Sequence, residues 1–494
     1  MSSGYEPLSQ SPHVHFEENE GEDGSVEVPS PLLEQREQTS GRIRWIYFTF
    51  GAAVLLPWNV LITAIPFFLS RLIGSDLRST FSSYLSITFT LANFAFLAHA
   101  TATSQQSSPS RRTQISAASL AILNLCLTFS TSIPSSASPF FAFVLLNAVA
   151  QACAGSYLQT ATVATASLFG SVAMQAMMAG QAFVGVVVSA VQLLSTMASV
   201  RAASIYVDYD TKSAEARAAA LFFGLSTFFL ICTLFTHAWL VRLPEYRDVV
   251  VPIEQAKKTD DAALPGIVSA SEEKGRILRV AKMNFEYEFA VAYVFIVTLA
   301  VFPPITTSIM PTSPSFNPLI FNALHFLLFN VGDLAGRYLC AVPKFTTWSS
   351  RRLVILSLLR TLFIPIFLLC NLQPPTAIPN PLPSPGIPPS ADLPNLLLRQ
   401  ISSSPSPVIN SDFLFFLILL AFGLSNGYVS SMCMMAAPNE EHNPRLRKRG
   451  PSGRSDVDIA ATTANFCLIG GLVVGSAASF AVRAQVCNCN PFTQ

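Results

Sequence analysis

Residues 45–69 read WIYFTFGAAVLLPWNVLITAIPFFL, a stretch that contains no charged side chain. A helix needs roughly 20 predominantly apolar residues to cross a bilayer, so this stretch is long enough to span one. The whole chain of 494 residues is also apolar: only 12% of its residues are charged, and its mean hydropathy is +0.46. Soluble domains contain roughly 25% charged residues. The composition therefore predicts an integral membrane protein and disfavours a soluble enzyme.

The same length criterion predicts eleven membrane-spanning helices in this chain. They run approximately over residues 45–69, 81–100, 113–133, 139–166, 172–200, 218–241, 287–309, 317–340, 353–371, 413–436 and 459–483. Ser, Thr, Ala and Gly are abundant in the fourth, fifth and eleventh spans, and such small residues favour close contacts between the helices of a bundle. We therefore predict an all-α polytopic membrane protein.

Polar and proline-rich connections divide these spans into parts. Nine acidic side chains and one basic side chain, with Ser, Pro and Gly between them, predict that the N-terminal tail is disordered. A proline-rich connection after the ninth span is expected to be extended and exposed. The predicted parts are an acidic tail at 1–40, an N-terminal bundle at 41–242, a polar loop at 243–284, a C-terminal bundle at 285–483 containing the proline-rich loop 372–411, and a C-terminal tail at 484–494.

The basic residues predict the orientation in the membrane. With an odd number of spans the two termini lie on opposite sides. If the N-terminus is inside, the inside segments hold 21 basic residues and the outside segments hold seven. Cytoplasmic loops carry the excess of Lys and Arg, so we expect a cytoplasmic N-terminus and a luminal or extracellular loop 372–411. The plasma membrane and the vacuolar or lysosomal membrane both stay open as locations.

Two ionisable residues in the eighth span are the main candidates for chemistry. Asp333 and Arg337 are four residues apart, so they share one face of a helix. Ionisable groups inside a membrane are costly and usually functional. The carboxylate and the guanidinium can pair with each other, or both can turn to a polar ligand. The alternative is a structural ion pair that holds the two bundles together.

Polar and aromatic residues in other spans extend this candidate set. Pro57 lies inside the first span, where it frees a backbone carbonyl and bends the helix. Trp58 follows it and offers a flat surface on which an aromatic ligand can stack. An interfacial tryptophan is the alternative, but Trp58 lies in the middle of the span. In the fourth span the amide of Gln159 needs hydrogen-bond partners, which a ligand can supply.

Two of these segments resemble signatures of the equilibrative nucleoside transporters. Residues 51–64 (GAAVLLPWNVLITA) resemble the first-helix signature of that family, and residues 329–337 (FNVGDLAGR) resemble its eighth-helix signature. Further similar segments are Ala179-Gly180-Gln181, Val301-Phe302-Pro303-Pro304 and Ser425-Asn426-Gly427-Tyr428. The resemblance covers about residues 41–485. It implies eleven helices in a major-facilitator-like 6+5 arrangement with a cytoplasmic N-terminus.

The resemblance also implies roles for individual residues. The tryptophan that lines the base pocket maps to Trp58, and the pair that engages the ribose hydroxyls maps to Asp333 and Arg337. A glutamine that contacts the base corresponds to Gln159, although the glycine spacing around it departs from the family pattern. The remaining predicted substrate-binding residues are Leu55, Ile62 and Asn330, and the predicted gate residues are Phe302, Pro303 and Phe326.

The predicted function is facilitated, sodium-independent transport of nucleosides such as uridine and adenosine, and also of nucleobases, by alternating access. Sodium-driven carriers assemble several oxygen ligands, whereas Asp333 is the only acidic residue that we place well inside a span. His325, about two turns earlier, leaves proton coupling as an alternative. A carrier of another small polar solute is a further alternative.

Outside transport, the alternatives are a receptor, a scramblase or a membrane enzyme. The H-E-x-x-H, G-x-S-x-G and P-loop patterns do not occur in the sequence, which counts against an enzyme. We expect a monomer in the lipid bilayer with no cofactor and no metal. The net charge of +1 offers no general attraction to nucleic acid, so no such partner is expected.

Overall fold

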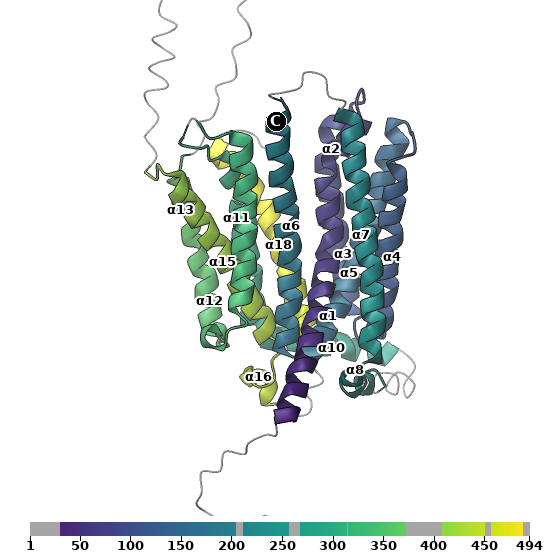
Figure 1. Cartoon of the computed structure of the whole chain (residues 1–494). Coiled ribbons are helices and arrows are strands. Elements are labelled where there is room, and N and C mark those ends of the chain that lie inside the picture. The colour runs from purple at the N-terminus through teal and green to yellow at the C-terminus, as the bar shows by residue number, and fades with distance from the viewer. Residues whose placement is uncertain are drawn as a thin grey trace, which may run out of the picture. The chain divides into compact units, whose positions relative to one another are not determined.

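The computed structural model of the chain describes residues 30–203, 211–255, 267–313, 315–371, 408–449 and 456–487. Within these residues the regular elements are helices, and an isolated bridge joins Cys370 to Ile409. Met1–Gly41 and Arg42–Gln494 are two separate compact units. Figure 1 shows the long helices of the larger unit side by side. The predicted all-α fold class is confirmed.

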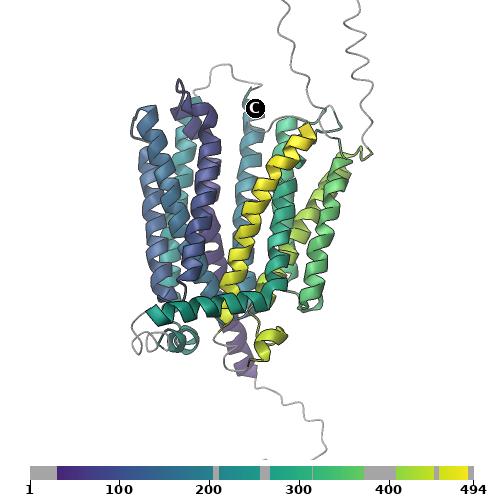
Figure 2. The ribbon, with the colours of Figure 1, turned by 180° about the vertical axis from the view of Figure 1, so that it is seen from behind.

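The helices fall into two halves in chain order. The N-terminal half contains α1 Ser30–Thr63, α2 Ile65–Arg71, α3 Leu77–Ala102, α4 Pro109–Ser130, α5 Ala137–Leu168, α6 Ser171–Ala203, α7 Thr211–Arg242 and α8 Pro244–Val249. The C-terminal half contains α10 Ile267–Val301, η1 Thr306–Ser308, α11 Pro318–Leu339, η2 Pro343–Phe345, α12 Ser350–Leu359, η3 Arg360–Leu362, α13 Phe363–Leu368, α15 Asp412–Ala436, α16 Pro444–Arg447 and α18 Val457–Cys487. Figure 2 shows α18, in yellow, between helices of the two halves.

Ten helices in the described part of the chain are long and apolar enough to cross a membrane, and each overlaps a predicted span. The predicted ninth span, 353–371, is instead divided among α12, η3 and α13. Pro365 has no N–H to donate to the carbonyl of Thr361, and its ring crowds that carbonyl. The regular helix ends just before this point, at Leu359. The count of eleven is therefore not confirmed, and the difference is this broken segment.

The structure differs from the predicted boundaries in three connections. Residues 30–40, predicted as part of a disordered tail, belong to α1, because Pro31 is tolerated in the first turn and good helix formers follow it. The predicted loop 243–284 contains α8 and the first turns of α10. The predicted tail 484–494 begins inside α18. Residues 1–29, and residues 372–407 of the proline-rich loop, lie outside the described residues.

Two hydrophobic clusters are each confined to one half of the bundle. Phe68, Phe81 and Phe140 belong to a cluster built from the N-terminal half. Phe321 and Phe367 belong to another that is built from the C-terminal half. Each half therefore has an apolar core of its own.

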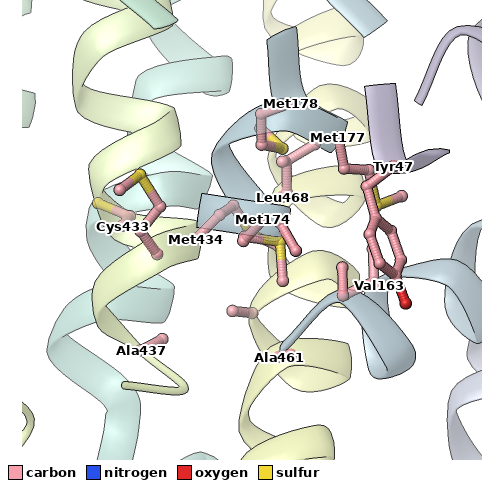
Figure 3. Close-up of a cluster of buried hydrophobic side chains, with 14 of the residues drawn as sticks. Tyr47, Val163, Met174, Met177, Met178, Cys433, Met434, Ala437, Ala461 and Leu468 are labelled. Carbon is pink, nitrogen blue, oxygen red and sulfur yellow. The ribbon is translucent and has the colours of Figure 1, made fainter. Parts of the chain in front are cut away.

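A third cluster joins the halves at the end of the bundle where α8 and α16 lie (Figure 1). We call it the shared cluster. Figure 3 shows part of it, with residues Tyr47 of α1, Val163 of α5, Met174, Met177 and Met178 of α6, Cys433 and Met434 of α15 and Leu468 of α18. Methionine is unbranched and adapts to irregular spaces. The halves are thus packed together at this end by side chains that can rearrange.

Helices α11 and α15 approach each other closely inside the C-terminal half. A Cβ atom on Gly427 would lie 1.9 Å from the carbonyl oxygen of Asp333, and a Cβ atom on Gly336 would lie 2.1 Å from the carbonyl oxygen of Leu424. Only glycine permits two helix backbones to approach so closely. This contact fixes the position of Asp333 along the helix axis relative to α15.

We expect Gly427→Ala to destabilise the protein, because overpacking of this kind costs about 1–3 kcal/mol. The matched control is Gly155→Ala in α5, where a Cβ atom would meet nothing within 4 Å and alanine is the better helix former. Thermal unfolding of both purified variants in detergent measures the difference. A Tm for Gly427→Ala equal to that of the control would contradict the close contact between α11 and α15.

Candidate functional site

One face of α11 carries four of the predicted site and gate residues. Phe326, Asn330, Asp333 and Arg337 follow one another at helical spacings of four, three and four residues, so they line one side of the helix. The helix begins cleanly because the Asn317 side chain accepts hydrogen bonds from the first backbone N–H groups and Pro318 follows it. The register of this face is therefore set by the start of the helix.

Asp333 and Arg337 form a buried ion pair, which is one of the two arrangements that their spacing allows. The Nε atom of Arg337 donates to Oδ2 of Asp333 over 2.9 Å. Both residues are 6% exposed. A charge-assisted hydrogen bond of this kind is about twice as strong as a neutral one. The pairing is confirmed, whereas the role of the pair in binding stays a prediction.

Neighbouring helices complete the hydrogen bonds of this pair. Asn426 of α15 donates to Oδ1 of Asp333 over 2.6 Å. Nη1 of Arg337 donates to the carbonyl oxygen of Met178 in α6 over 2.9 Å, and Gln175 of α6 donates to the carbonyl oxygen of Arg337 over 2.9 Å. The ion pair thus lies where the C-terminal half meets α6 of the N-terminal half, and it is bonded without a ligand.

A second buried arginine extends the network and was missed as a site residue. Arg360 is 1% exposed and donates to the carbonyl oxygen of Phe422 over 3.0 Å and to Oγ1 of Thr298 over 2.8 Å. Thr298 donates in turn to Oδ1 of Asn426 over 2.7 Å. An arginine inside a predicted span was the available signal. Its partners are more than 60 positions away in the sequence, so no local pattern identifies them.

Gln159 joins the halves at another point. Its Nε2 atom donates to Oδ1 of Asn465 in α18 over 2.8 Å, and Gln159 is 8% exposed. The Nδ2 atom of Asn465 is buried without a hydrogen-bond partner among the described residues. Because a buried amide N–H is costly to leave unpaired, a polar ligand near Asn465 would gain a strong hydrogen bond. Asn465 is therefore a further site candidate, and no local sequence pattern indicates it.

Trp58 lies in a separate aromatic contact. Its ring stacks on Phe89 of α3 with a centroid distance of 4.5 Å and an interplanar angle of 29°. Leu55 and Ile62 lie on the same face of α1, three residues before and four after Trp58, and all three are half-buried. Helix α1 continues through Pro57. In the described residues no hydrogen bond or ring contact joins Trp58 to the ion pair or to Gln159.

The predicted gate residues gather where α10 ends. The Phe302 ring stacks on Phe329 at a centroid distance of 4.1 Å and meets Phe326 edge-on at 5.2 Å. Pro303 is exposed. Nearby on α11, Asn330 donates to Oγ of Ser189 in α6 over 2.6 Å. The gate residues therefore adjoin the same contact between α11 and α6 that carries the ion pair.

A second carboxylate lies inside the bundle, which corrects the interpretation of Asp333 as the only one. Glu288 of α10 is 5% exposed. Its Oε2 atom is 3.7 Å from Sγ of Cys467 in α18, and Oε1 has no hydrogen-bond partner among the described residues. Glu288 lies at the edge of the predicted span, which begins at residue 287, whereas α10 starts 20 residues earlier.

The chain is similar to known transporters over most of its length. The sequence profile of the nucleoside transporter family matches residues 144–384 and 393–484. Equilibrative nucleoside transporter 1 of Rattus norvegicus is 25% identical, with 89% of this chain and 96% of the relative covered. Equilibrative nucleoside transporter 2 of Mus musculus is 28% identical over the same shares.

Solved structures support the fold independently of these relatives. The major facilitator superfamily proton:xylose symporter XylE bound to 6-bromo-6-deoxy-D-glucose aligns with a TM-score of 0.53 and 12% identity, covering 92% of each chain. At that identity the likeness establishes the fold alone, and it confirms the predicted major-facilitator-like bundle. The chain is thus a transporter and not an enzyme, and it belongs to the equilibrative nucleoside transporter family.

Proposed function

We propose that the protein carries nucleosides, and also nucleobases, across a membrane by sodium-independent facilitated diffusion with alternating access. The observation that carries this proposal is the buried Asp333–Arg337 pair at the contact between α11 and α6. A ligand bound there contacts both halves, so it can follow their relative motion. The nucleoside transporters to which the chain is similar support the substrate class.

The chemistry of a nucleoside fits the predicted binding residues. Its ribose diol offers two hydroxyls, which can donate to the carboxylate of Asp333 and accept from the guanidinium of Arg337. Its base has an apolar face that can stack on Trp58 and amide-like edges that can bond Gln159. Leu55 and Ile62 add apolar wall, and Asn330 adds an amide.

The packing of the halves supports the alternating-access mechanism. The shared cluster seals the end of the bundle at α8 and α16, whereas the other two large clusters are each confined to one half. Opening the sealed end requires the methionines of α6 to separate from those of α15, and their flexibility lowers the cost of repacking. Phe302, Pro303 and Phe326 act as a gate on the other side of the ion pair.

The basic residues support a cytoplasmic N-terminus, which makes the sealed end the cytoplasmic one. The protein works as a monomer in the plasma membrane or in the vacuolar or lysosomal membrane. A second candidate function is proton-coupled nucleoside transport. The buried carboxylate of Glu288 favours it, because an intramembrane carboxylate with no ion-pair partner among the described residues is a typical proton carrier.

We expect purified protein in liposomes to show saturable uptake of radiolabelled uridine or adenosine, and Asp333→Asn and Arg337→Gln each to lose it. Asparagine at 333 keeps an acceptor for Asn426 but removes the charge that binds the ribose. The matched control is Arg445→Gln, which breaks a 2.8 Å ion pair with the partly exposed Glu286. Wild-type uptake by either of the first two variants, at equal protein content, would remove the pair from the binding site.

The second expectation concerns Trp58. Trp58→Ala should raise the KM for uridine about threefold to tenfold and Trp58→Phe should restore most of the affinity, because aromatic stacking is worth about 0.5–1.5 kcal/mol. Trp45→Ala on the same helix is the control, since Trp45 is 71% exposed. Equal KM values for wild type, Trp58→Ala and Trp45→Ala would exclude Trp58 from the pocket.

The third expectation concerns coupling. With equal nucleoside on both sides, neither an imposed sodium gradient nor an imposed pH gradient should drive accumulation into liposomes. Accumulation with sodium would overturn the proposed sodium independence. If a pH gradient drives accumulation in the wild type but not in Glu288→Gln, the protein is a proton symporter and Glu288 carries the proton.

A further inference from the structure

A cavity of about 870 Å³ lies between α3, α4 and α5, away from the proposed nucleoside site. One end of its lining is polar and includes His99, Thr103, Arg111, Arg112 and Tyr157. The other end is apolar and includes Ile122, Leu123 and Ala150. The cavity is therefore amphipathic along its length.

Small side chains on α5 create this hollow. Ala150, Cys153 and Ala154 lie three and four residues apart, so they present one face of α5 to α4. On α4 the lining runs from Arg111 to Leu123, which spans about 18 Å along the helix. That length is about half of the roughly 30 Å hydrocarbon thickness of a bilayer, which is the depth of one leaflet.

The apolar part of the cavity opens to the side of the bundle. Ile115 and Ile122 are 54% and 60% exposed, and Phe129 continues the same exposed strip of α4 at 61%. Large apolar side chains exposed on a membrane-spanning helix face lipid. An occupant of the cavity can therefore enter from the surrounding bilayer.

The polar end is a pre-arranged cationic site. Arg112 donates to the carbonyl oxygen of Ala100 over 2.9 Å and to Oγ1 of Thr103 over 2.9 Å, and its Cζ atom is 5.4 Å from the centroid of the Tyr157 ring. The hydroxyl of Tyr157 is 2.6 Å from Nδ1 of His99. These contacts fix the guanidinium of Arg112 at the wall of the cavity.

Arg111 is the free cation at this end. Its side chain is exposed, and within the described residues its guanidinium makes no hydrogen bond or ion pair. Glu273 accepts from Gln106 over 3.2 Å and Glu254 accepts from Ser108 over 2.6 Å, and within the described residues neither carboxylate forms an ion pair with Arg111. The exposed guanidinium of Arg111 is therefore available to bind an anionic group at the rim.

We propose that this cavity binds an anionic glycerophospholipid of the cytoplasmic leaflet. Its phosphate lies at Arg111 and Arg112, and one acyl chain follows Ile115 and Ile122 between α4 and α5. Basic pockets between membrane helices on the cytoplasmic side are typical sites for anionic headgroups. The choice of leaflet rests on the proposed orientation and does not depend on which solute is carried.

Native mass spectrometry of the full chain in mild detergent, titrated with phosphatidylserine and separately with phosphatidylcholine, tests this proposal. We expect phosphatidylserine to bind more tightly, and Arg111→Gln to weaken it about fivefold. Arg78→Gln is the control, because Arg78 is an exposed arginine at the opposite end of α3. The proposal would be overturned if Arg111→Gln and Arg78→Gln bound phosphatidylserine with equal affinity. It would also be overturned if the wild type bound phosphatidylserine and phosphatidylcholine with equal affinity.

A second variant tests the acyl chain. Cys153→Trp fills the hollow and should abolish binding of phosphatidylserine, while Ala150→Leu, a smaller change, should weaken it. Gel filtration of each variant verifies folding. Excess glycerol phosphate should not displace the lipid, because it lacks the acyl chain. Complete displacement by glycerol phosphate, or unaltered lipid binding by folded Cys153→Trp, would show that the site does not hold a phospholipid.

Discussion

An ionised side chain between membrane helices needs a partner, because the hydrocarbon region supplies no water to replace one. In this protein that constraint organises the C-terminal half around Asp333. Its two carboxylate oxygens accept from Arg337 and from Asn426, and Asn426 accepts in turn from Thr298. Arg360 bonds the same threonine. Helices α10, α11 and α15 and the short η3 therefore cannot shift singly without leaving a charged group unpaired.

The network depends on how closely the helix backbones approach. Asn426 reaches Asp333 because the neighbouring Gly427 leaves no side chain between α15 and α11. The small residue Gly427 thus permits the hydrogen bond from its neighbour Asn426 to Asp333. Helix α6 repeats this arrangement against α1, where a Cβ atom on Gly180 would lie 2.0 Å from the carbonyl oxygen of Phe48. Helix α6 is held against α1 at this point and bonded to α11 through Met178.

Local patterns in the sequence predicted much of this arrangement. Hydropathy located every long helix among the described residues, and a spacing of four residues placed Asp333 and Arg337 on one face of a helix. Patterns could not give partners that are distant in the chain, such as Asn465 for Gln159, because pairing across 306 positions depends on packing. The broken ninth span is different. Pro365 was visible in the sequence, and its effect on the carbonyl four residues earlier follows from proline geometry, so an interruption of this span was predictable, while the count of eleven stays unconfirmed.

The distribution of charged groups affects one step of the proposed transport cycle, in which the carrier changes conformation without a bound nucleoside. The Asp333–Arg337 pair lies wholly on α11, so its strongest bond stays inside one half when the halves move. The bonds that cross between the halves are weaker. They include Gln159 to Asn465 and Asn330 to Ser189, which are neutral hydrogen bonds worth about 1 kcal/mol each. Charged groups also bond across the halves: Asp458 accepts from Gln105 over 2.9 Å, and Arg337 donates to the carbonyl of Met178. A ribose hydroxyl can replace that carbonyl as the acceptor, which would ease the separation of α6 from α11 when nucleoside is bound.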